Sequence, residues 1–185
     1  MIIGVTGTIG AGKGTVVDYL VKEKGFIHLS VRDYLLGEIR HRGMEVEDRS
    51  AMREVANELR ALHGPAHIIE ALYERALERE TPALIESIRA IGEAEFLKQK
   101  GAMILAVDAD RKLRYERITA RGASTDHVDF DTWVMQEERE LASTEPWDMN
   151  VIGVMRMADH RIENDGSLEA LYEKVDAVLS SLPPR

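Results

Sequence analysis

Residues 2–15 read Ile-Ile-Gly-Val-Thr-Gly-Thr-Ile-Gly-Ala-Gly-Lys-Gly-Thr, an apolar run followed by a glycine-rich segment that ends in a lysine and a threonine. The apolar run predicts a buried strand, and the spaced glycines predict a tight loop after it. Glycine lets backbone N–H groups approach a polyphosphate without a Cβ in the way, and the following helix adds its partly positive N-terminus. The stretch therefore predicts a phosphate-binding loop, and its expected ligand-binding residues are Gly7, Thr8, Gly10, Ala11, Gly12, Lys13, Gly14 and Thr15.

The spacing of this loop departs from the common nucleotide-binding motif at one position. Gly7 and the Gly12-Lys13 pair match the pattern Gly-x-x-x-x-Gly-Lys-Ser/Thr, and Lys13 is expected to reach the β and γ phosphates. Gly14 stands where the motif has a hydroxyl residue, and the hydroxyl follows one position later at Thr15. A magnesium ion would therefore depend on carboxylates from elsewhere in the chain, which hold it through its waters.

Composition limits the class of protein. The chain has 185 residues, of which 44% are hydrophobic, and this suffices for one well-buried α/β domain. A formal net charge of -9 argues against a large nucleic-acid-binding surface. Cysteine is absent, which excludes disulfides and thiolate metal sites, and no apolar run approaches the roughly 20 residues that cross a bilayer. We expect a cytoplasmic monomer or small homo-oligomer that binds neither nucleic acid nor membrane.

The order of apolar runs predicts the fold. A strand, a helix and a second strand fill the first thirty residues, which is the pattern of a parallel crossover unit. Two later apolar runs, at 83–86 and 102–107, and a segment at about 160–163 predict three further strands with helices between them. The predicted fold is a three-layer α/β sandwich with a five-stranded parallel sheet, which binds ligands at the carboxyl ends of its strands. We expect a single domain whose core comprises residues 1–33, 81–121 and 148–185.

Two segments interrupt this core. Residues 34–80 predict three helices, with apolar positions that include Leu62 and Leu77, and they are expected to form a second wall of the cleft. Residues 122–147 are polar, with a thin apolar seam at Phe130, Val134 and Leu141. A thin seam predicts weak packing, as in a mobile lid. Trp133 in this segment is assigned to packing.

Basic side chains follow the fourth predicted strand. Arg114, Arg117 and Arg121 lie on one side of a helix that Asp110 can cap. This row fits either a solvated basic face or a phosphate-binding face, and its position after a strand end favours phosphate contact. The histidines, among them His28 on the second strand, show no metal-binding spacing.

Taken together, these features resemble a nucleoside monophosphate kinase over essentially the whole chain. The shared features are the Gly-Lys-Gly-Thr loop, Asp33 after the second strand, a helical insertion, Arg89 after the third strand, and an arginine helix before a short polar lid. The tail at 158–169 also resembles dephospho-CoA kinases and adenylate-kinase-like proteins of archaea. The resemblance implies an ATP-dependent phosphotransferase.

The family pattern implies roles for individual residues. Lys13 would hold the β and γ phosphates of ATP, and Asp33 and Glu86 would order Mg²⁺ through its waters. Arg89 would grip the acceptor phosphate. The arginines that would close over the transferring group are Arg117, Arg121 and Arg139.

The chain departs from adenylate kinases on the acceptor side. Leu36 stands where they place an arginine, and Arg40 is the nearest substitute, one turn further on. The expected acceptor contacts are Asp33, Arg40, Glu86 and Arg89. The lid lacks cysteines, so it carries no zinc. We expect a nucleoside monophosphate kinase first, with a dephospho-CoA kinase and a nucleotide-dependent ATPase switch as alternatives.

Overall fold

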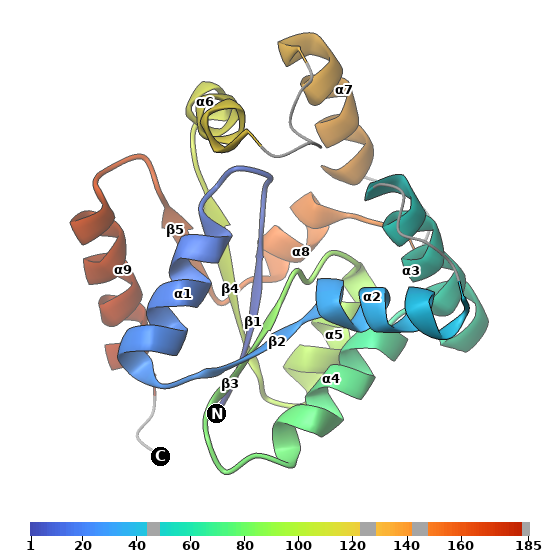
Figure 1. Cartoon of the computed structure of the whole chain (residues 1–185). Coiled ribbons are helices and arrows are strands. Elements are labelled where there is room, and N and C mark those ends of the chain that lie inside the picture. The colour runs from blue at the N-terminus through green and yellow to red at the C-terminus, as the bar shows by residue number, and fades with distance from the viewer. Residues whose placement is uncertain (44–48, 123–128, 142–147, 183–185) are drawn as a thin grey trace.

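A parallel sheet forms the centre of the molecule (Figure 1). The computed structural model describes residues 1–43, 49–122, 129–141 and 148–182. Within these residues the strands lie in the order β2-β3-β1-β4-β5, and every pair is parallel. Their bounds are β1 Ile2–Gly7, β2 Ile27–Ser30, β3 Ala83–Glu86, β4 Met103–Asp108 and β5 His160–Glu163. The predicted five-stranded α/β fold is therefore confirmed.

Helices cover both faces of this sheet. The predicted cap at Asp110 is confirmed, because its side chain accepts hydrogen bonds from backbone N–H groups in the first turn of α6, and Ser167 caps α9 in the same way. The helices are α1 Lys13–Lys24, α2 Val31–His41, α3 Arg49–His63, α4 His67–Leu77, α5 Ile91–Gln99, α6 Arg111–Arg121, α7 Phe130–Leu141, α8 Val151–Met157 and α9 Leu168–Ser180. Among the residues described, no helix is both long and apolar enough to cross a bilayer.

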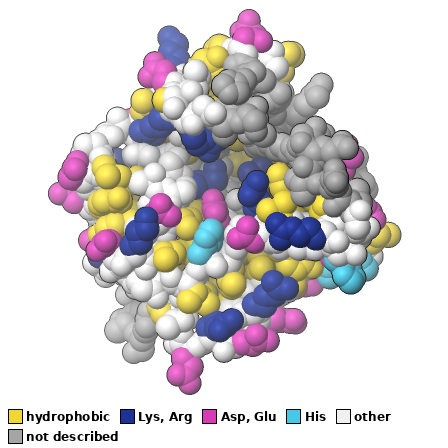
Figure 2. Space-filling view, viewed as in Figure 1, with side chains coloured by type: hydrophobic (Ala, Val, Ile, Leu, Met, Phe, Trp, Pro, Cys, Tyr) yellow, Lys and Arg dark blue, Asp and Glu magenta, His cyan; other side chains and the backbone are white. Residues whose placement is uncertain are grey.

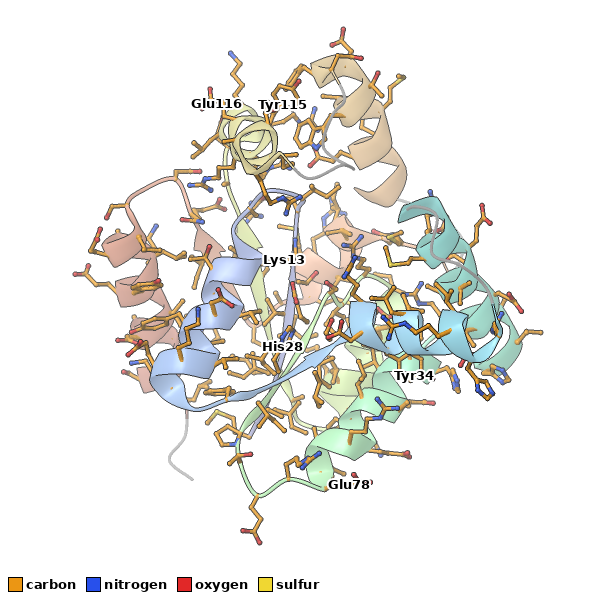
Figure 3. All side chains as sticks on the ribbon, in the orientation of Figure 1. Lys13, His28, Tyr34, Glu78, Tyr115 and Glu116 are labelled. Atoms are coloured by element: carbon orange, nitrogen blue, oxygen red, sulfur yellow. The ribbon has the colours of Figure 1, made fainter. Side chains whose placement is uncertain are left out.

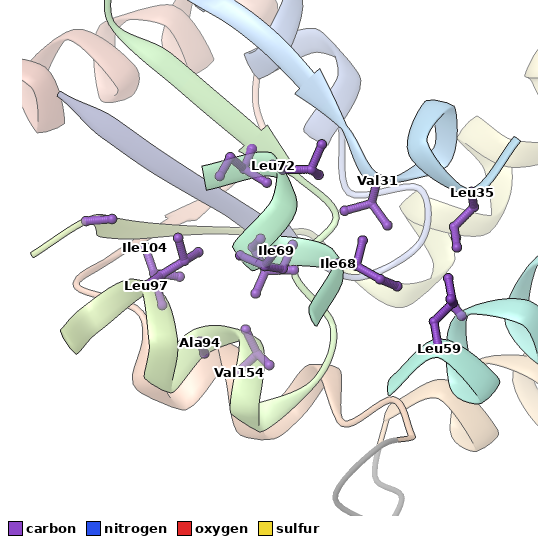
Figure 4. Close-up of a cluster of buried hydrophobic side chains, with 14 of the residues drawn as sticks. Val31, Leu35, Leu59, Ile68, Ile69, Leu72, Ala94, Leu97, Ile104 and Val154 are labelled. Atoms are coloured by element: carbon purple, nitrogen blue, oxygen red, sulfur yellow. The ribbon is translucent and has the colours of Figure 1, made fainter. Parts of the chain in front are cut away.

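The core has one apolar cluster on each side of the sheet. Helices α1 and α9 pack against one face, where Val16, Leu20 and Val175 are buried. Helices α4, α5 and α8 cover the other face, and α2 and α3 continue that cluster away from the sheet (Figure 4). Val31 and Leu59 link those outer helices to the main core. The segment at 34–80 is thus packed onto the sheet layer, with the same apolar core as its base.

Several predicted apolar positions are wrong in detail. Leu62, Leu77 and Leu168 are 67%, 64% and 48% exposed. All three lie in terminal turns, where a helix extends past the edge of the core, and helical periodicity carries no information about that edge. Helix α5 begins at Ile91, where the Glu93 carboxylate accepts the N–H of Ala90 and stabilises the first turn.

The predicted apolar seam of the lid is described only in part, with Val134 half-buried and Phe130 packed against Tyr115 and Trp133. The best-buried described side chains of α7 are Trp133 and Glu137, at 3% and 1% exposed, whereas Phe130 is 36% exposed. Trp133 packs against Tyr115 and Phe130, which confirms its assignment to packing. The side chain of Leu141 lies outside what the structure describes. Helix α7 therefore attaches to α6 through the aromatic rings of Phe130 and Trp133 and the buried carboxylate of Glu137.

Candidate active site

The predicted phosphate-binding loop connects β1 to α1 at the carboxyl edge of the sheet. Gly7 and Gly12 have φ angles of 141° and 95°, in the region that favours glycine. A Cβ at Gly7 would collide with the carbonyl of Val107, and one at Gly12 would collide with the side chain of Asn164. By contrast, a Cβ at Gly14 would meet nothing within 4 Å. The loop geometry therefore requires glycine at the first two positions and leaves room for a side chain at the third.

Lys13 lies inside this loop as the first residue of α1. Its Nζ donates hydrogen bonds to the carbonyl oxygens of Gly7, at 2.9 Å, and Thr8, at 2.8 Å. The ammonium thus neutralises two oxygens that would otherwise repel an anion. Figure 3 shows Lys13 at the top of α1, with His28 of β2 below it in this view.

Two side chains from distant parts of the chain hold further carbonyls of the loop. Arg114 Nη1 donates to the carbonyl of Ile9 at 3.1 Å, and Asn164 Nδ2 donates to that of Ala11 at 2.8 Å. Asn164 follows β5 and is 7% exposed. Sequence reasoning missed Asn164, although its place directly after a predicted strand end was a usable signal. Carbonyls held by cationic or amide donors make the loop a preorganised anion site.

The side chain of Thr8 is also fixed. Its hydroxyl donates to Asp108 Oδ1 at 2.5 Å, and Arg161 Nη2 contacts the other oxygen of Asp108 at 3.0 Å. Asp108 ends β4, beside the loop. Because both of its oxygens are engaged, Asp108 acts as a brace for the loop.

The carboxylate of Glu86 lies at the end of β3, next to β1. His28 Nε2 lies 3.0 Å from Glu86 Oε2. This hydrogen bond, with the charges of His28, Lys13 and Arg89, holds the pKa of Glu86 below its usual value although burial opposes the shift. The predicted donor-side lysine and acceptor-side arginine therefore act on one carboxylate.

His28 was missed as a site residue. The same hydrogen bond to Glu86 raises the pKa of His28, and the charge of Asp33 adds to that effect. The register pairs Ser30 with Glu86, so His28, two residues earlier, points to the same side of the sheet. Alternation along β2 was the signal that sequence reasoning did not use. Asp33 itself is exposed in the first turn of α2.

Hard oxygen ligands are what Mg²⁺ prefers, and a magnesium ion keeps several of its waters. Asp33 and Glu86 supply such oxygens at neighbouring strand ends, so the donor set fits an ion held through water. Within the described ranges no group of three or more histidine, aspartate or glutamate side chains is arranged to hold a metal directly.

Arg89 sits in the short loop between β3 and α5. Its N–H donates to Glu93 Oε2 at 2.8 Å, and its carbonyl accepts the N–H of Asn150 at 2.8 Å. Arg89 Nη1 contacts Met149 Sδ at 3.5 Å. Ser87, just before it, has a φ of 73°, which is uncommon for a residue with a side chain. The backbone that carries Arg89 is therefore held tightly from both sides.

The arginine row of α6 divides into separate environments, and neither predicted alternative describes all of it. Arg114 is 4% exposed, pairs with the buried Glu137, and lies over the ring of Trp133 with its guanidinium 5.3 Å from the ring centre. It bridges the phosphate loop and α7 and does not face solvent. The expectation of phosphate contact is wrong for Arg114, because a buried carboxylate occupies its guanidinium.

The other predicted arginines differ in placement. Arg117 Nη2 donates to the carbonyl of Asn164 at 2.8 Å, while its Nη1 is buried and finds no hydrogen-bond partner among the described residues. Arg121 is exposed at the end of α6. The side chain of Arg139 lies outside what the structure describes. Arg40 is exposed on α2.

The outer helices contribute a polar cluster that the sequence did not indicate. Asp148 accepts hydrogen bonds from Arg53 Nη2 at 2.9 Å and from Asn57 Nδ2 at 3.0 Å. Burial alone would raise the pKa of Asp148, but these bonds and the N–H of Met149 hold it below its usual value.

Figure 2 shows lysine and arginine side chains gathered around a hollow in the centre of this face of the molecule.

Comparison with known proteins gives the same fold. Residues 3–143 match the family described as an AAA domain. A UPF0200 protein from Methanothermobacter thermautotrophicus is 31% identical over 98% of this chain and 90% of its own. Among solved structures, TT1252 from Thermus thermophilus aligns with a TM-score of 0.61 and 27% identity, covering 100% of this chain and 98% of its own.

Shikimate kinase from Bacteroides thetaiotaomicron is 14% identical, with a TM-score of 0.59, and the alignment covers 97% of this chain and 98% of that one. At this identity the likeness concerns the fold alone. It confirms the P-loop kinase-like fold that the sequence predicted, and such a fold implies nucleotide binding. Because the sequence match to its relative extends over nearly the whole of both chains, this protein belongs to the UPF0200 family of P-loop proteins with an AAA domain.

Proposed function

We propose that the protein transfers the γ-phosphate of Mg-ATP to a small acceptor, in the first place a nucleoside monophosphate. One observation carries the proposal. After its hydrogen bond with His28, the charges of Lys13, from the phosphate loop, and of Arg89, from the loop after β3, both lower the pKa of Glu86 at the end of β3. A lysine for the donor phosphates and an arginine for the acceptor phosphate would then act at one place.

The donor side would work by preorganisation. The glycine loop and Lys13 would bind the β and γ phosphates, and Asp33 and Glu86 would orient the waters of a magnesium ion. When bound, Mg²⁺ would neutralise charge on the phosphate oxygens. Because the loop carbonyls are already held by Lys13, Arg114 and Asn164, the loop needs little rearrangement to receive an anion.

The acceptor side would use the second wall of the cleft, residues 34–80, and Arg89. An arginine fork binds phosphate oxygens more strongly than a neutral donor does. Arg89 would hold the acceptor so that its attacking oxygen lies in line with the γ-phosphorus and the leaving oxygen of ADP. Arg117, Arg121 and Arg139 would stabilise charge on the transferring group, with residues 122–147 as the lid. Phosphoryl transfer needs little beyond this placement and charge stabilisation.

A coupled ADP-release screen tests the proposal. Purified protein with Mg-ATP is offered each nucleoside monophosphate, each deoxynucleoside monophosphate, dephospho-CoA and shikimate. The proposal expects acceptor-dependent ADP release with at least one monophosphate. ADP release with only dephospho-CoA or shikimate would show that the acceptor is not a nucleoside monophosphate. ADP release that no acceptor stimulates would favour an ATPase switch.

A further inference from the structure

A buried ion pair lies under the loop that carries Arg89. Glu93 is 0% exposed and Arg60 is 3% exposed. Arg60 donates to Glu93 Oε1 through Nε at 2.9 Å and through Nη2 at 2.8 Å. Burying two charges costs free energy that hydrophobic residues of similar volume would avoid, so such a pair is often kept for geometry instead of stability. Its position under Arg89 calls for a specific reason.

The second oxygen of Glu93 indicates that reason. Glu93 Oε2 accepts the N–H groups of Arg89, at 2.8 Å, and Ala90, at 3.0 Å. A glutamate at the third position of a helix often accepts the N–H of the capping residue, and an exposed glutamate does this equally well. Here the carboxylate also takes the N–H of Arg89 and is paired with an arginine from α3. The arrangement does more than cap α5, because it ties the Arg89 backbone to another helix.

From Arg60 the hydrogen bonds continue to a third segment. Arg60 Nη1 donates to Asn57 Oδ1 at 3.3 Å, and Asn57 Nδ2 donates to Asp148 Oδ1 at 3.0 Å. Asp148 Oδ1 also accepts the N–H of Met149 at 2.8 Å. Asp148 is the first described residue after the predicted lid, so the chain of bonds connects α3, the Arg89 loop and the segment that follows the lid.

The two ends of this chain of bonds also meet directly. The carbonyl of Arg89 accepts the N–H of Asn150, and Arg89 Nη1 contacts the sulfur of Met149. The Arg89 loop and residues 148–150 are therefore joined in a closed ring of contacts, with α3 on the far side. The amide side chain of Asn57 is the uncharged link in this ring and lies between two ion pairs, Arg60–Glu93 and Arg53–Asp148.

We propose that Asn57, Arg60 and Glu93 are positioning residues that hold Arg89 and residues 148–150 as one unit against α3. The proposal deepens the proposed function, because it rests on Arg89 as the acceptor arginine. Asn57 can donate to one carboxylate while its carbonyl accepts from Arg60, and no apolar residue can do both. Loss of Asn57 would release the unit from α3, and Arg89 would then meet the acceptor in a wider range of orientations.

The first arm of the test needs no substrate. Amide hydrogen exchange is measured by NMR for Asn57→Ala, with Glu54→Ala, an exposed position on the same helix, as the matched control. We expect protection of the amides of Arg89, Ala90 and Met149 to fall together by about tenfold in Asn57→Ala and to stay unchanged in the control. Amides of β4, an interior strand between β1 and β5, report global stability and should keep their protection. Asp148→Asn, which weakens the other side of the link, should show the same pattern.

The second arm is a double-mutant cycle with AMP as the acceptor probe. Asn57→Ala should lower kcat/KM for AMP by about fivefold with the KM for ATP unchanged, and the loss should nearly vanish when Arg89 is already alanine. A purely structural role would weaken the use of both substrates and would persist in the Arg89→Ala background.

The results separate the two proposals. Faster exchange in only one of the two segments, or equal changes throughout β4, would overturn the positioning role whatever the substrate. Coupled exchange in a protein that neither binds nor phosphorylates AMP would support the positioning role and remove AMP as an acceptor.

Discussion

The phosphate loop and the Arg89 loop both follow strand ends and each carries a cation whose charge lowers the pKa of Glu86, yet they are held in different ways. Much of the phosphate loop is held by its own residues, because Lys13 binds the carbonyls of Gly7 and Thr8. The Arg89 loop depends on a neighbouring helix and on Asn150, and through them on Asn57 of α3. The glycines and lysine of the phosphate loop form one contiguous motif, which Arg114, Asn164 and Asp108 support from elsewhere in the chain. The Arg89 loop has no such motif of its own.

This difference bears on function. Because the glycines and lysine of the phosphate loop are consecutive in sequence, a phosphate-binding loop can be identified from a few residues. A site assembled from three segments can change its acceptor through substitutions in any of them. The same fold is present in a shikimate kinase with 14% identity.

The largest expected effect comes from a substitution that impairs only the donor side, Lys13→Ala. Lys13→Ala should lower turnover by about 100-fold or more, because it removes one preorganised cation that meets developing charge in the transition state. Stability should change little. Steady-state ADP formation and thermal unfolding check this, with Lys22→Ala on the exposed side of α1 as the control. A folded Lys13→Ala protein with near wild-type turnover would contradict the account of the loop.

Two glycines of the same loop should respond in opposite directions. Gly12→Ala should lower the free energy of unfolding by about 1–3 kcal/mol, because of its positive φ and the collision with Asn164. Gly14→Ala should raise it by about 0.5–1 kcal/mol, since the position is helical and open. Urea denaturation of both variants measures the contrast. Equal effects would mean that the loop does not have the described shape.

Between the two loops lies the proposed magnesium site. Glu86→Gln and Asp33→Asn should each raise the Mg²⁺ concentration for half-maximal activity by about tenfold, because they remove charge that orients the waters of the ion. Activity measured across a magnesium titration shows the shift. Glu78→Gln, at the far end of the molecule in Figure 3, serves as the control. If neither variant moves the titration, the ion is held elsewhere.

The smallest expected effect is the contribution of the His28–Glu86 pair to the pH dependence of stability. The raised pKa of His28 means that its contribution to stability is complete below its unfolded pKa and is lost as pH rises through the folded pKa. The lowered pKa of Glu86 means that its contribution is present above its unfolded pKa and is lost as pH falls through the folded one. The pair should therefore stabilise the fold most between about pH 4.3 and 6.5.

An NMR titration of His28 checks this directly. In wild type its pKa should lie above the ordinary value, and in Glu86→Gln it should return toward about 6.5. An unchanged His28 pKa in the variant would show that the hydrogen bond does not set it.

The sequence predicts the features that neighbouring residues determine, and it does not predict contacts between residues far apart in the chain. Strands β3 and β5 have the predicted bounds, and in β3 a short apolar run between turn residues defines the strand locally. The phosphate loop is likewise local. The burial of Arg114 with Glu137, and the contact of Asn164 with Ala11, join residues from separate elements, and no pattern along the chain encodes such pairs. Their discovery required the tertiary structure.

The most direct test of two distinct substrate sites is calorimetric titration of wild type and Arg89→Ala with Mg-ATP and then with the acceptors of the screen. The account predicts an ATP affinity within about twofold of wild type and an acceptor affinity at least about tenfold weaker, because a charged fork on phosphate is lost on one side alone. Equal loss of both ligands, or no acceptor binding to wild type by any compound, would contradict a two-substrate kinase.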